Sequence, residues 1–160
     1  MFSIPIMDQF FYHYMESPVG SLTLLEKNEV LVGLKFGVSD HPSESTSLLL
    51  AVEVQLLEYF SGKRVSFDVP FSLVGTTFQM QAWDALMQIP YGETRAYADQ
   101  AKMVGDVKKA RAVGGANNKN PLPIIVPCHR VVGSDGSLGG YQPGVEKKEW
   151  LLELERSVSS

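Results

Sequence analysis

The sequence predicts an α+β fold in two domains, residues 1–74 and 75–160. Three observations support this fold class. Short runs of alternating or aromatic residues, separated by turn residues, fill the first third of the chain and are typical of strands. Later segments instead repeat apolar residues every three or four positions, as one face of a helix does. The composition also changes near Gly75, which places the domain boundary there.

The first domain is expected to combine a small sheet with one helix. Strands are predicted at residues 10–16, 21–26, 30–36 and 65–69, and a helix at residues 46–60. Ser17-Pro18-Val19-Gly20 is a turn after the first strand. The helix is predicted from the spacing of Leu49, Val52 and Leu56, and Gly62 ends it. Nothing in this domain carries a recognisable chemical motif.

The second domain is expected to be mainly helical. Helices are predicted from Thr76 or Thr77 to residue 89, from residue 94 to 103, from residue 107 to 117 and from residue 145 to about 157. A tight turn at Gly105-Asp106 joins the second and third of these, and the third is basic at its start. This is the pattern of a helix-turn-helix. An ordinary helical hairpin has the same pattern, so these residues alone leave both interpretations open.

The only cysteine of the chain, Cys128, is followed directly by His129 and Arg130. The apolar run Ile124-Ile125-Val126-Pro127 before it is expected to be a strand, after a corner at Pro121-Leu122-Pro123. A thiol attacks as its thiolate, and a neighbouring imidazole and guanidinium favour that form. A buried cysteine that packs as a small apolar residue is the alternative.

Composition and charge limit the function classes. With 44% hydrophobic and 20% charged residues the chain is an ordinary globular protein, and no apolar stretch reaches the roughly 18–20 residues that cross a bilayer. Residues 1–9 contain no basic cluster and no small-residue cleavage site, so no signal peptide is expected. One cysteine excludes an internal disulfide, which indicates a reducing compartment: the cytoplasm, or the nucleus in a eukaryote.

The net charge of −4 is unevenly distributed along the chain. Residues 1–74 hold four basic and nine acidic side chains, whereas residues 90–132 hold seven basic and three acidic ones. A local excess of positive charge can meet phosphates although the whole protein is acidic.

Several segments of the second domain together resemble the O6-alkylguanine-DNA alkyltransferase family. The segments that match in order and spacing are Gly75-Thr76-Thr77-Phe78-Gln79, Pro90-Tyr91-Gly92-Glu93-Thr94, Ala110-Arg111-Ala112-Val113-Gly114-Gly115-Ala116, Asn120-Pro121, Pro127-Cys128-His129-Arg130-Val131-Val132 and Lys148-Glu149-Trp150-Leu151-Leu152. The resemblance covers roughly residues 75–155, and the first domain matches loosely. It implies a ribonuclease H-like α/β domain followed by a winged-helix domain that holds the cysteine.

The resemblance implies one irreversible transfer of an alkyl group from O6 of guanine in DNA to the sulfur of Cys128. No cofactor is expected, and the protein is consumed because a thioether has no low-energy route back to a thiol. His129 is implied to take the thiol proton through one bridging water, since neighbours on an extended strand point to opposite sides. Glu155 is implied to orient the imidazole in a Cys-His-Glu relay, although a surface helix residue is the alternative for it.

The resemblance also assigns residues around the target base. Tyr97 would donate a hydrogen bond to the departing guanine, and Asn120 would bond to the active-site turn. Core packing and a turn cap are the respective alternatives. Backbone carbonyls of Cys128 and Val131 would accept from the exocyclic amine of guanine. The remaining walls of the pocket would be Pro123, Tyr141 and Gln142.

The implied partner is double-stranded DNA that carries O6-alkylguanine, with O4-alkylthymine as a further candidate. The base must leave the duplex to reach the thiolate, and Arg111 would fill its place in the stack from a helix in the minor groove. Further DNA contacts are expected from Tyr97, Ala112, Gly114, Gly115, Asn117 and Arg130. Small residues allow close approach to DNA, but they also suit helix packing. No membrane is involved, and a monomer is expected.

The sequence departs from the family pattern at three places. Gln142 stands where many members have serine, so a donor to O6 must be its backbone N–H or its amide. Asn117 and Asn118 replace residues that are often apolar or basic beside DNA. Mammalian members bind zinc through cysteines and histidines of the first domain, and one cysteine is too few for that site, so no metal is expected.

Two other functions fit parts of the pattern. Alkyltransferase-like proteins bind lesions without reacting, but they lack the acceptor cysteine that is present here. A transcription regulator could use the helix-turn-helix, but the chain has no room for a regulatory domain. A cysteine hydrolase would need oxyanion donors, for which no motif is found.

Overall fold

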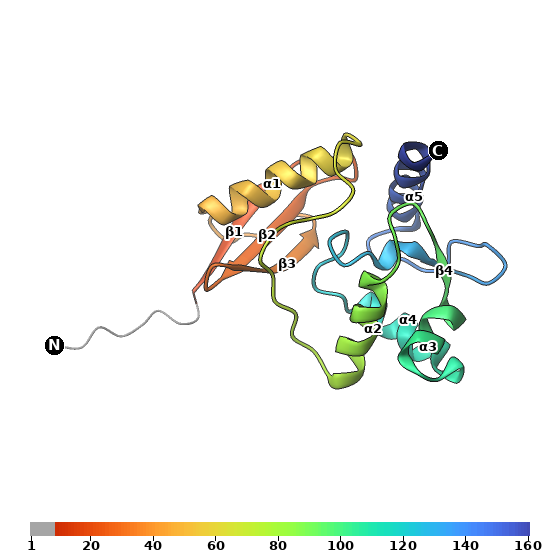
Figure 1. The fold of residues 1–160 in the computed structure, drawn as a ribbon. Helices are drawn as coiled ribbons and strands as arrows, with labels where there is room; N and C mark the ends of the chain where they lie inside the picture. Colours follow the sequence, from red (N-terminus) through yellow and green to blue (C-terminus); the bar gives the residue numbers. More distant parts are fainter. Residues whose placement is uncertain (1–8) are drawn as a thin grey trace.

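The first half of the molecule is a three-stranded sheet with one helix lying across it (Figure 1). The computed structural model describes residues 9–160, so nearly all of the segment searched for a signal peptide lies outside the described residues. The elements are β1 (Phe10–Met15), β2 (Leu22–Lys27), β3 (Val30–Phe36) and α1 (Ser47–Phe60). The strands are antiparallel in the order β1-β2-β3, so each pairs with its neighbour in sequence.

Local sequence explains these four elements. Asn28 and Glu29 join β2 to β3 with φ angles of 54° and 64°, and two left-handed residues are what a tight type I′ hairpin turn requires. Thr46 caps α1, since its hydroxyl accepts from the backbone N–H of Leu49 at 3.1 Å. The three strands and the helix predicted within residues 10–60 are confirmed, with ends that differ by one residue at most.

The strand predicted at residues 65–69 is wrong. The chain meets the sheet only later, through a single bridge between Phe71 and Leu31 of β3. There the N–H of Leu31 donates to the carbonyl of Pro70, and the N–H of Ser72 donates to the carbonyl of Leu31. Proline has no N–H to offer to a ladder, so the pairing does not extend back through Pro70.

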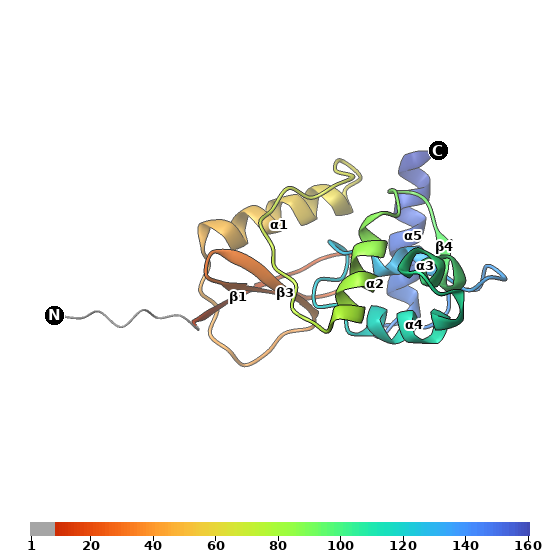
Figure 2. The ribbon, with the colours of Figure 1, turned by 60° about the horizontal axis from the view of Figure 1, so that its bottom comes forward.

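The second half is built from helices and two very short strands (Figure 2). Its elements are α2 (Thr77–Met87), β4 (Arg95–Ala96), α3 (Tyr97–Val104), η1 (Val107–Lys109), α4 (Ala110–Asn118), η2 (Cys128–Arg130), β5 (Val131–Val132) and α5 (Val145–Ser159). β4 and β5 are parallel. Because β4 precedes α3 and β5 follows η2, this pairing brings the start of α3 beside the segment that holds Cys128.

Two predicted helix starts are corrected. The helix predicted from Thr94 begins at Tyr97, because the carboxylate of Asp99 accepts from the backbone N–H of Ala96 and caps the helix there. The helix predicted from Val107 begins with a 3-10 turn before α4. The turn between α3 and α4 uses Gly105 at a φ of 110°, as the tight connection requires.

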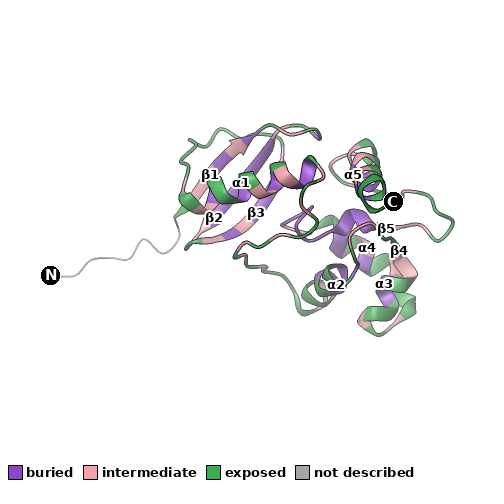
Figure 3. Ribbon diagram, turned by 45° about the horizontal axis from the view of Figure 1, so that its top comes forward, coloured by how far each residue is buried: buried purple, intermediate pink, exposed green. Residues whose placement is uncertain are grey.

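One apolar core runs through both halves of the molecule, and Figure 3 shows buried residues on the sheet and on the helices that face it. Leu24 and Leu56 of the first half belong to the same buried cluster as Trp83 and Leu151 of the second. The last residue of α1, Phe60, meets Trp150 of α5 with ring centroids 6.0 Å apart. The end of α1 therefore packs against α5. Among residues 9–160, no helix has the length and apolarity needed to cross a membrane.

Candidate active site

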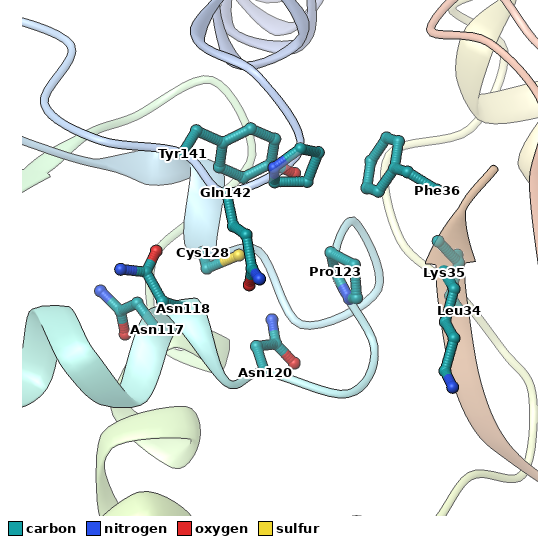
Figure 4. A pocket seen from close by; sticks show the side chains of 11 residues that line it. Leu34, Lys35, Phe36, Asn117, Asn118, Asn120, Pro123, Cys128, Tyr141 and Gln142 are labelled. Carbon is teal, nitrogen blue, oxygen red and sulfur yellow. The ribbon is translucent and has the colours of Figure 1, made fainter.

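Cys128 lies at a pocket with a volume of about 430 Å³, between the two halves of the molecule. Figure 4 shows its sulfur pointing into the space between Asn120 and Gln142. The other residues that line the pocket are Leu34, Lys35 and Phe36 of β3, Asn117 and Asn118 of α4, and Pro123, Tyr141 and Pro143. The volume is within the range of small-ligand sites. Cys128 is a buried residue, 7% exposed, but it lines this pocket and is therefore not walled off in the core.

The segment before Cys128 is a compact turn, and the strand predicted at residues 124–127 is wrong. The N–H of Val126 donates to the carbonyl of Leu122 at 2.8 Å, and Ile124 has a φ of 77°. Cys128 then begins the 3-10 turn η2. Three prolines at positions 121, 123 and 127 remove backbone donors, which prevents a regular ladder here. Cys128 and His129 are therefore neighbours in a 3-10 turn and not on an extended strand, so strand alternation does not set the directions of their side chains.

Asn120 ties this turn together. Its Nδ2 donates to the carbonyl of Val126 at 2.7 Å, and its Oδ1 accepts from the N–H of Leu122 at 2.9 Å. Asn120 is thus both the turn cap and the bond to the active-site turn that the sequence offered as alternatives. It also lines the pocket, and its amide lowers the pKa of the Cys128 thiol.

His129 and Glu155 form a buried pair. Nε2 of His129 lies 2.7 Å from Oε2 of Glu155, and the two side chains are 0% and 1% exposed. Burial lowers the pKa of His129 although Glu155 opposes this, so the imidazole is neutral at pH 7. Nε2–H then donates to the carboxylate and Nδ1 is the basic nitrogen. Nδ1 is buried without a hydrogen-bond partner among the described residues.

The resting thiol is protonated. Burial raises the pKa of Cys128, against the lowering effects of the Asn120 amide and the positive charge of Lys148. Within residues 9–160, no direct hydrogen bond joins Sγ to His129. In the resting protein both the Cys128 thiol and the His129 imidazole are therefore neutral, and the thiol proton has not been transferred.

Arg130 does not face solvent, so its predicted contact with DNA is wrong. Arg130 is 8% exposed. Its Nε donates to Oε1 of Glu155 at 2.8 Å, and its Nη2 donates to Oε2 at 3.0 Å. Nη1 donates to the carbonyl of Ile89 at 2.8 Å. The guanidinium completes a buried, bidentate ion pair. Together with His129 it outweighs the effect of burial and holds the pKa of Glu155 well below its usual range.

Asn117 and Val131 also differ from their predicted places. The amide of Asn117 exchanges two hydrogen bonds of 2.8 Å with the amide of Gln100 on α3, so it joins two helices and is not free to contact DNA. Val131 is fully buried and does not line the pocket. Its carbonyl accepts from Nζ of Lys148 at 2.6 Å.

Apart from Asn117, the predicted DNA-contact residues of α4 lie on its outer side. Arg111, Ala112 and Gly115 are exposed, and a Cβ added at Gly115 would meet nothing within 4 Å. A Cβ at Gly114 would lie 3.6 Å from the ring of Tyr97, an ordinary contact. Helix packing therefore requires glycine at neither position. Tyr97, Arg111 and Gly114 border a second hollow of about 360 Å³.

Tyr97 and Tyr141 both present protonated hydroxyls. Burial, followed by the negative charge that Cys128 carries as a thiolate, raises the pKa of each phenol. The Tyr141 hydroxyl is buried and has no hydrogen-bond partner in the described part of the chain, although the residue lines the pocket.

Both halves of the chain match known protein families. The profile of the "6-O-methylguanine DNA methyltransferase, DNA binding domain" matches residues 77–157, and that of the "ribonuclease-like domain" of the same methyltransferase matches residues 10–73. The chain belongs to the 6-O-methylguanine DNA methyltransferase family. The predicted fold class, a ribonuclease-like domain followed by a DNA-binding domain, is confirmed.

Individual members of this family are similar over nearly their whole length. The methylated-DNA–protein-cysteine methyltransferase of Methanosarcina acetivorans is 46% identical over 92% of this chain and 99% of the relative. The constitutive enzyme of Bacillus subtilis is 43% identical over 91% and 95%. The crystal structure of Mycobacterium tuberculosis OGT in complex with DNA has a TM-score of 0.86 at 44% identity, over 92% of this chain and 94% of that one. The predicted activity, methyl transfer from DNA to a protein cysteine, and the DNA partner are confirmed for the family.

Two buried residues of this methyltransferase site were not assigned from the sequence. Lys148 is 1% exposed, and burial lowers its pKa to about 8 although a Cys128 thiolate would raise it. The burial of Lys148 could have been predicted from the spacing of residues in the sequence. Lys148 lies on one helical face with Leu151, Leu152 and Glu155, and all four are buried. Tyr59 bonds to Glu155 from α1, and no local pattern indicates that contact.

Proposed function

We propose that this methyltransferase repairs DNA by accepting one alkyl group from O6 of guanine on Sγ of Cys128, and that it is consumed by the reaction. The observation that carries the proposal is the position of the single thiol. It lies in a pocket large enough for a nucleobase and is adjacent in sequence to a buried, neutral imidazole whose Nδ1 lacks a partner within residues 9–160.

The first step is deprotonation of the thiol. Nδ1 of His129 accepts the proton through one water molecule. The carboxylate of Glu155 holds the imidazole and compensates the resulting positive charge, and Arg130 holds that carboxylate in place. Lys148 and the Asn120 amide stabilise the thiolate, because both lower the pKa of Cys128.

The second step is displacement at the alkyl carbon. The S–C bond forms as the C–O6 bond breaks, and the electron pair of that bond remains on guanine. The hydroxyl of Tyr97 donates a hydrogen bond to the departing base, which then takes up a proton and becomes neutral guanine. His129 releases the proton that it accepted, so atoms and charge balance.

The pocket residues orient the base. Pro123 and Tyr141 form walls, and the exposed Gln142 supplies an amide or backbone N–H to O6 in place of the serine common in the family. An O4-alkylthymine presents a similar reacting oxygen and is a second candidate substrate. Both bases must leave the duplex, and Arg111 on the exposed side of α4 fills the space.

Two broader expectations complete the proposal. The protein acts as a monomer, because one chain contains the thiol, the base and the DNA-facing helix. It works inside the cell, in the cytoplasm or in a eukaryotic nucleus, where its free thiol stays reduced.

The decisive experiment is mass spectrometry after incubation with duplex DNA that contains O6-methylguanine. We expect one added methyl group per chain, on the tryptic peptide that holds Cys128, together with restored guanine in the DNA. Cys128→Ser is the matched control, because it keeps the size of the side chain and should gain no methyl group. Methylation at another residue, or equal repair by the Cys128→Ser variant, would contradict the proposal.

A further inference from the structure

The carboxylate of Glu155 receives hydrogen bonds from four different residues. Oε2 accepts from Tyr59 at 2.6 Å, from His129 at 2.7 Å and from Arg130 at 3.0 Å. Oε1 accepts from Arg130 at 2.8 Å and from the backbone N–H of Gly92 at 3.2 Å. Tyr59 and His129 therefore share one oxygen of the group that holds the imidazole in place.

Tyr59 differs from the other donors because it comes from the first half of the molecule. It lies in the last turn of α1, 96 residues before Glu155 in the sequence, and is 0% exposed. Burial, and after it the charge of Glu155, raises the pKa of Tyr59 well above its usual value. The phenol thus keeps its proton and acts as a donor to the carboxylate throughout the working range of pH.

We propose that Tyr59 is a positioning residue for alkyl transfer, through which the first half of the molecule controls the proton affinity of the His129–Glu155 pair. The inference rests on the proposed role of His129 as the base. A donor on Oε2 fixes the carboxylate and also withdraws charge from it, so Glu155 attracts a proton on His129 less strongly. The ribonuclease-like half, which otherwise carries no chemical motif, thereby becomes part of the reacting site.

Removal of the hydroxyl should act in a defined direction. Without Tyr59 as a donor, Glu155 holds more uncompensated charge, and the pKa of His129 rises. Only neutral imidazole accepts the thiol proton, so the acidic limb of the rate profile moves to higher pH. The ionisable groups around His129 are Tyr59 from α1, Tyr91 from the loop before β4, Cys128 and Arg130 from η2, and Lys148 and Glu155 from α5.

Tyr91 provides a matched control for a variant at Tyr59. Its hydroxyl is also buried, but it has no hydrogen-bond partner among the described residues, and its ring lies 6.2 Å from that of Tyr59. Tyr91→Phe removes a neighbouring phenol oxygen without removing a bond to Glu155. Phenylalanine also keeps the ring that faces the guanidinium of Arg130.

The experiment measures single-turnover methyl transfer to the full-length protein, from duplex DNA with O6-methylguanine, between pH 5 and 9. For Tyr59→Phe we expect an acidic limb about half a pH unit higher, and hence a rate roughly 3-fold lower on that limb, with a smaller loss above it. For Tyr91→Phe we expect the wild-type profile. The proposal would be overturned if the acidic limb of Tyr59→Phe lay at the wild-type pH, or if the transfer rate fell by the same factor at every pH. Either result would mean that Tyr59 has only a structural role.

A second variant keeps the test decisive if Tyr59→Phe does not fold. Tyr59→3,5-difluorotyrosine preserves the ring and the hydroxyl but makes the phenol a stronger donor. The acidic limb should then move to lower pH, and an unchanged limb would overturn the proposal. Failure of the proposed function itself is recognised separately, because the wild-type protein would then gain no methyl group at Cys128.

Discussion

Two arginines of the second half, Arg130 and Arg111, show how differently one residue type is used in this molecule. Arg130 is 8% exposed and gives its donors to Glu155 and to the carbonyl of Ile89. Arg111 lies on the exposed side of α4 beside a shallow hollow. Both contribute to the same local excess of positive charge in the sequence.

The difference separates two tasks in this methyltransferase. The charge of Arg130 is used inside the protein to hold the Glu155 carboxylate that positions His129. The charge of Arg111 is exposed to solvent, and the chain is a member of a family whose partner is DNA. A count of basic residues therefore overstates the charge available to phosphates.

The largest expected effect is loss of stability on removal of Arg130. Arg130→Ala leaves the buried Glu155 with part of its charge unpaired, so the free energy of unfolding should fall by about 3–5 kcal/mol. Arg111→Ala removes an exposed side chain and should change it by no more than about 0.5 kcal/mol. Urea unfolding at pH 7 measures both. Equal losses in the two variants would show that the two arginines are not used differently.

Arg111→Ala should instead affect repair. If Arg111 fills the place of the extruded base, its removal should slow methyl transfer from duplex DNA by roughly 10- to 100-fold, because unstacking a base costs a few kcal/mol. Reaction with free O6-methylguanine, which needs no extrusion, should change little. Single-turnover rates with the two substrates give the comparison. If both reactions slow by the same factor, Arg111 does not replace the extruded base in the DNA duplex.

The smallest expected effect is the dependence of stability on pH, which should come from the buried cluster. Burial lowers the pKa of His129, so below its usual value of 6.5 the unfolded chain binds a proton that the folded chain excludes. Glu155, with its pKa also lowered, adds a loss below its usual value of 4.5. Stability should be full at neutral pH and should fall on acidification, by at most about 1.4 kcal/mol per pH unit for each group.

Urea midpoints between pH 7 and 4 measure this dependence. His129→Gln should reduce the part between pH 7 and 5, whereas Arg111→Ala should leave the whole profile unchanged because arginine does not titrate in this range. A profile unaffected by His129→Gln would place the titrating groups elsewhere.

The elements that the sequence predicted well are those with a local cause. The strands on either side of Asn28 and Glu29, the helix at residues 46–60 and the helix from residue 145 were predicted, and each is set by residues within a few positions, such as the turn at Asn28 and Glu29 and the cap at Thr46. The strand expected before Cys128 is absent because the three prolines of this segment exclude a ladder. This turn therefore also has a local cause.

The errors at Arg130 and Asn117 have a different origin. From the sequence alone, Arg130 is a reasonable DNA contact because it is a basic residue close to the predicted nucleophile. Asn117 is one because its amide lies on the helix expected to bind DNA. Their partners, Glu155 and Gln100, lie 25 and 17 residues away and reach them only after the helices pack. Exposure is thus a property of the packed molecule and not of the residue type.

The amino-acid sequence is enough to place the chain in its family and to predict the order of its domains and Cys128 as the nucleophile, because these depend on motifs whose residues are close together in the chain. The tertiary structure alone decided which charges are buried, which nitrogen of His129 is free to accept a proton and that Tyr59 of the first half bonds to Glu155. The physical reason is that hydrogen bonding and desolvation act over a few ångströms, and packing brings together groups that lie up to 96 residues apart in the chain.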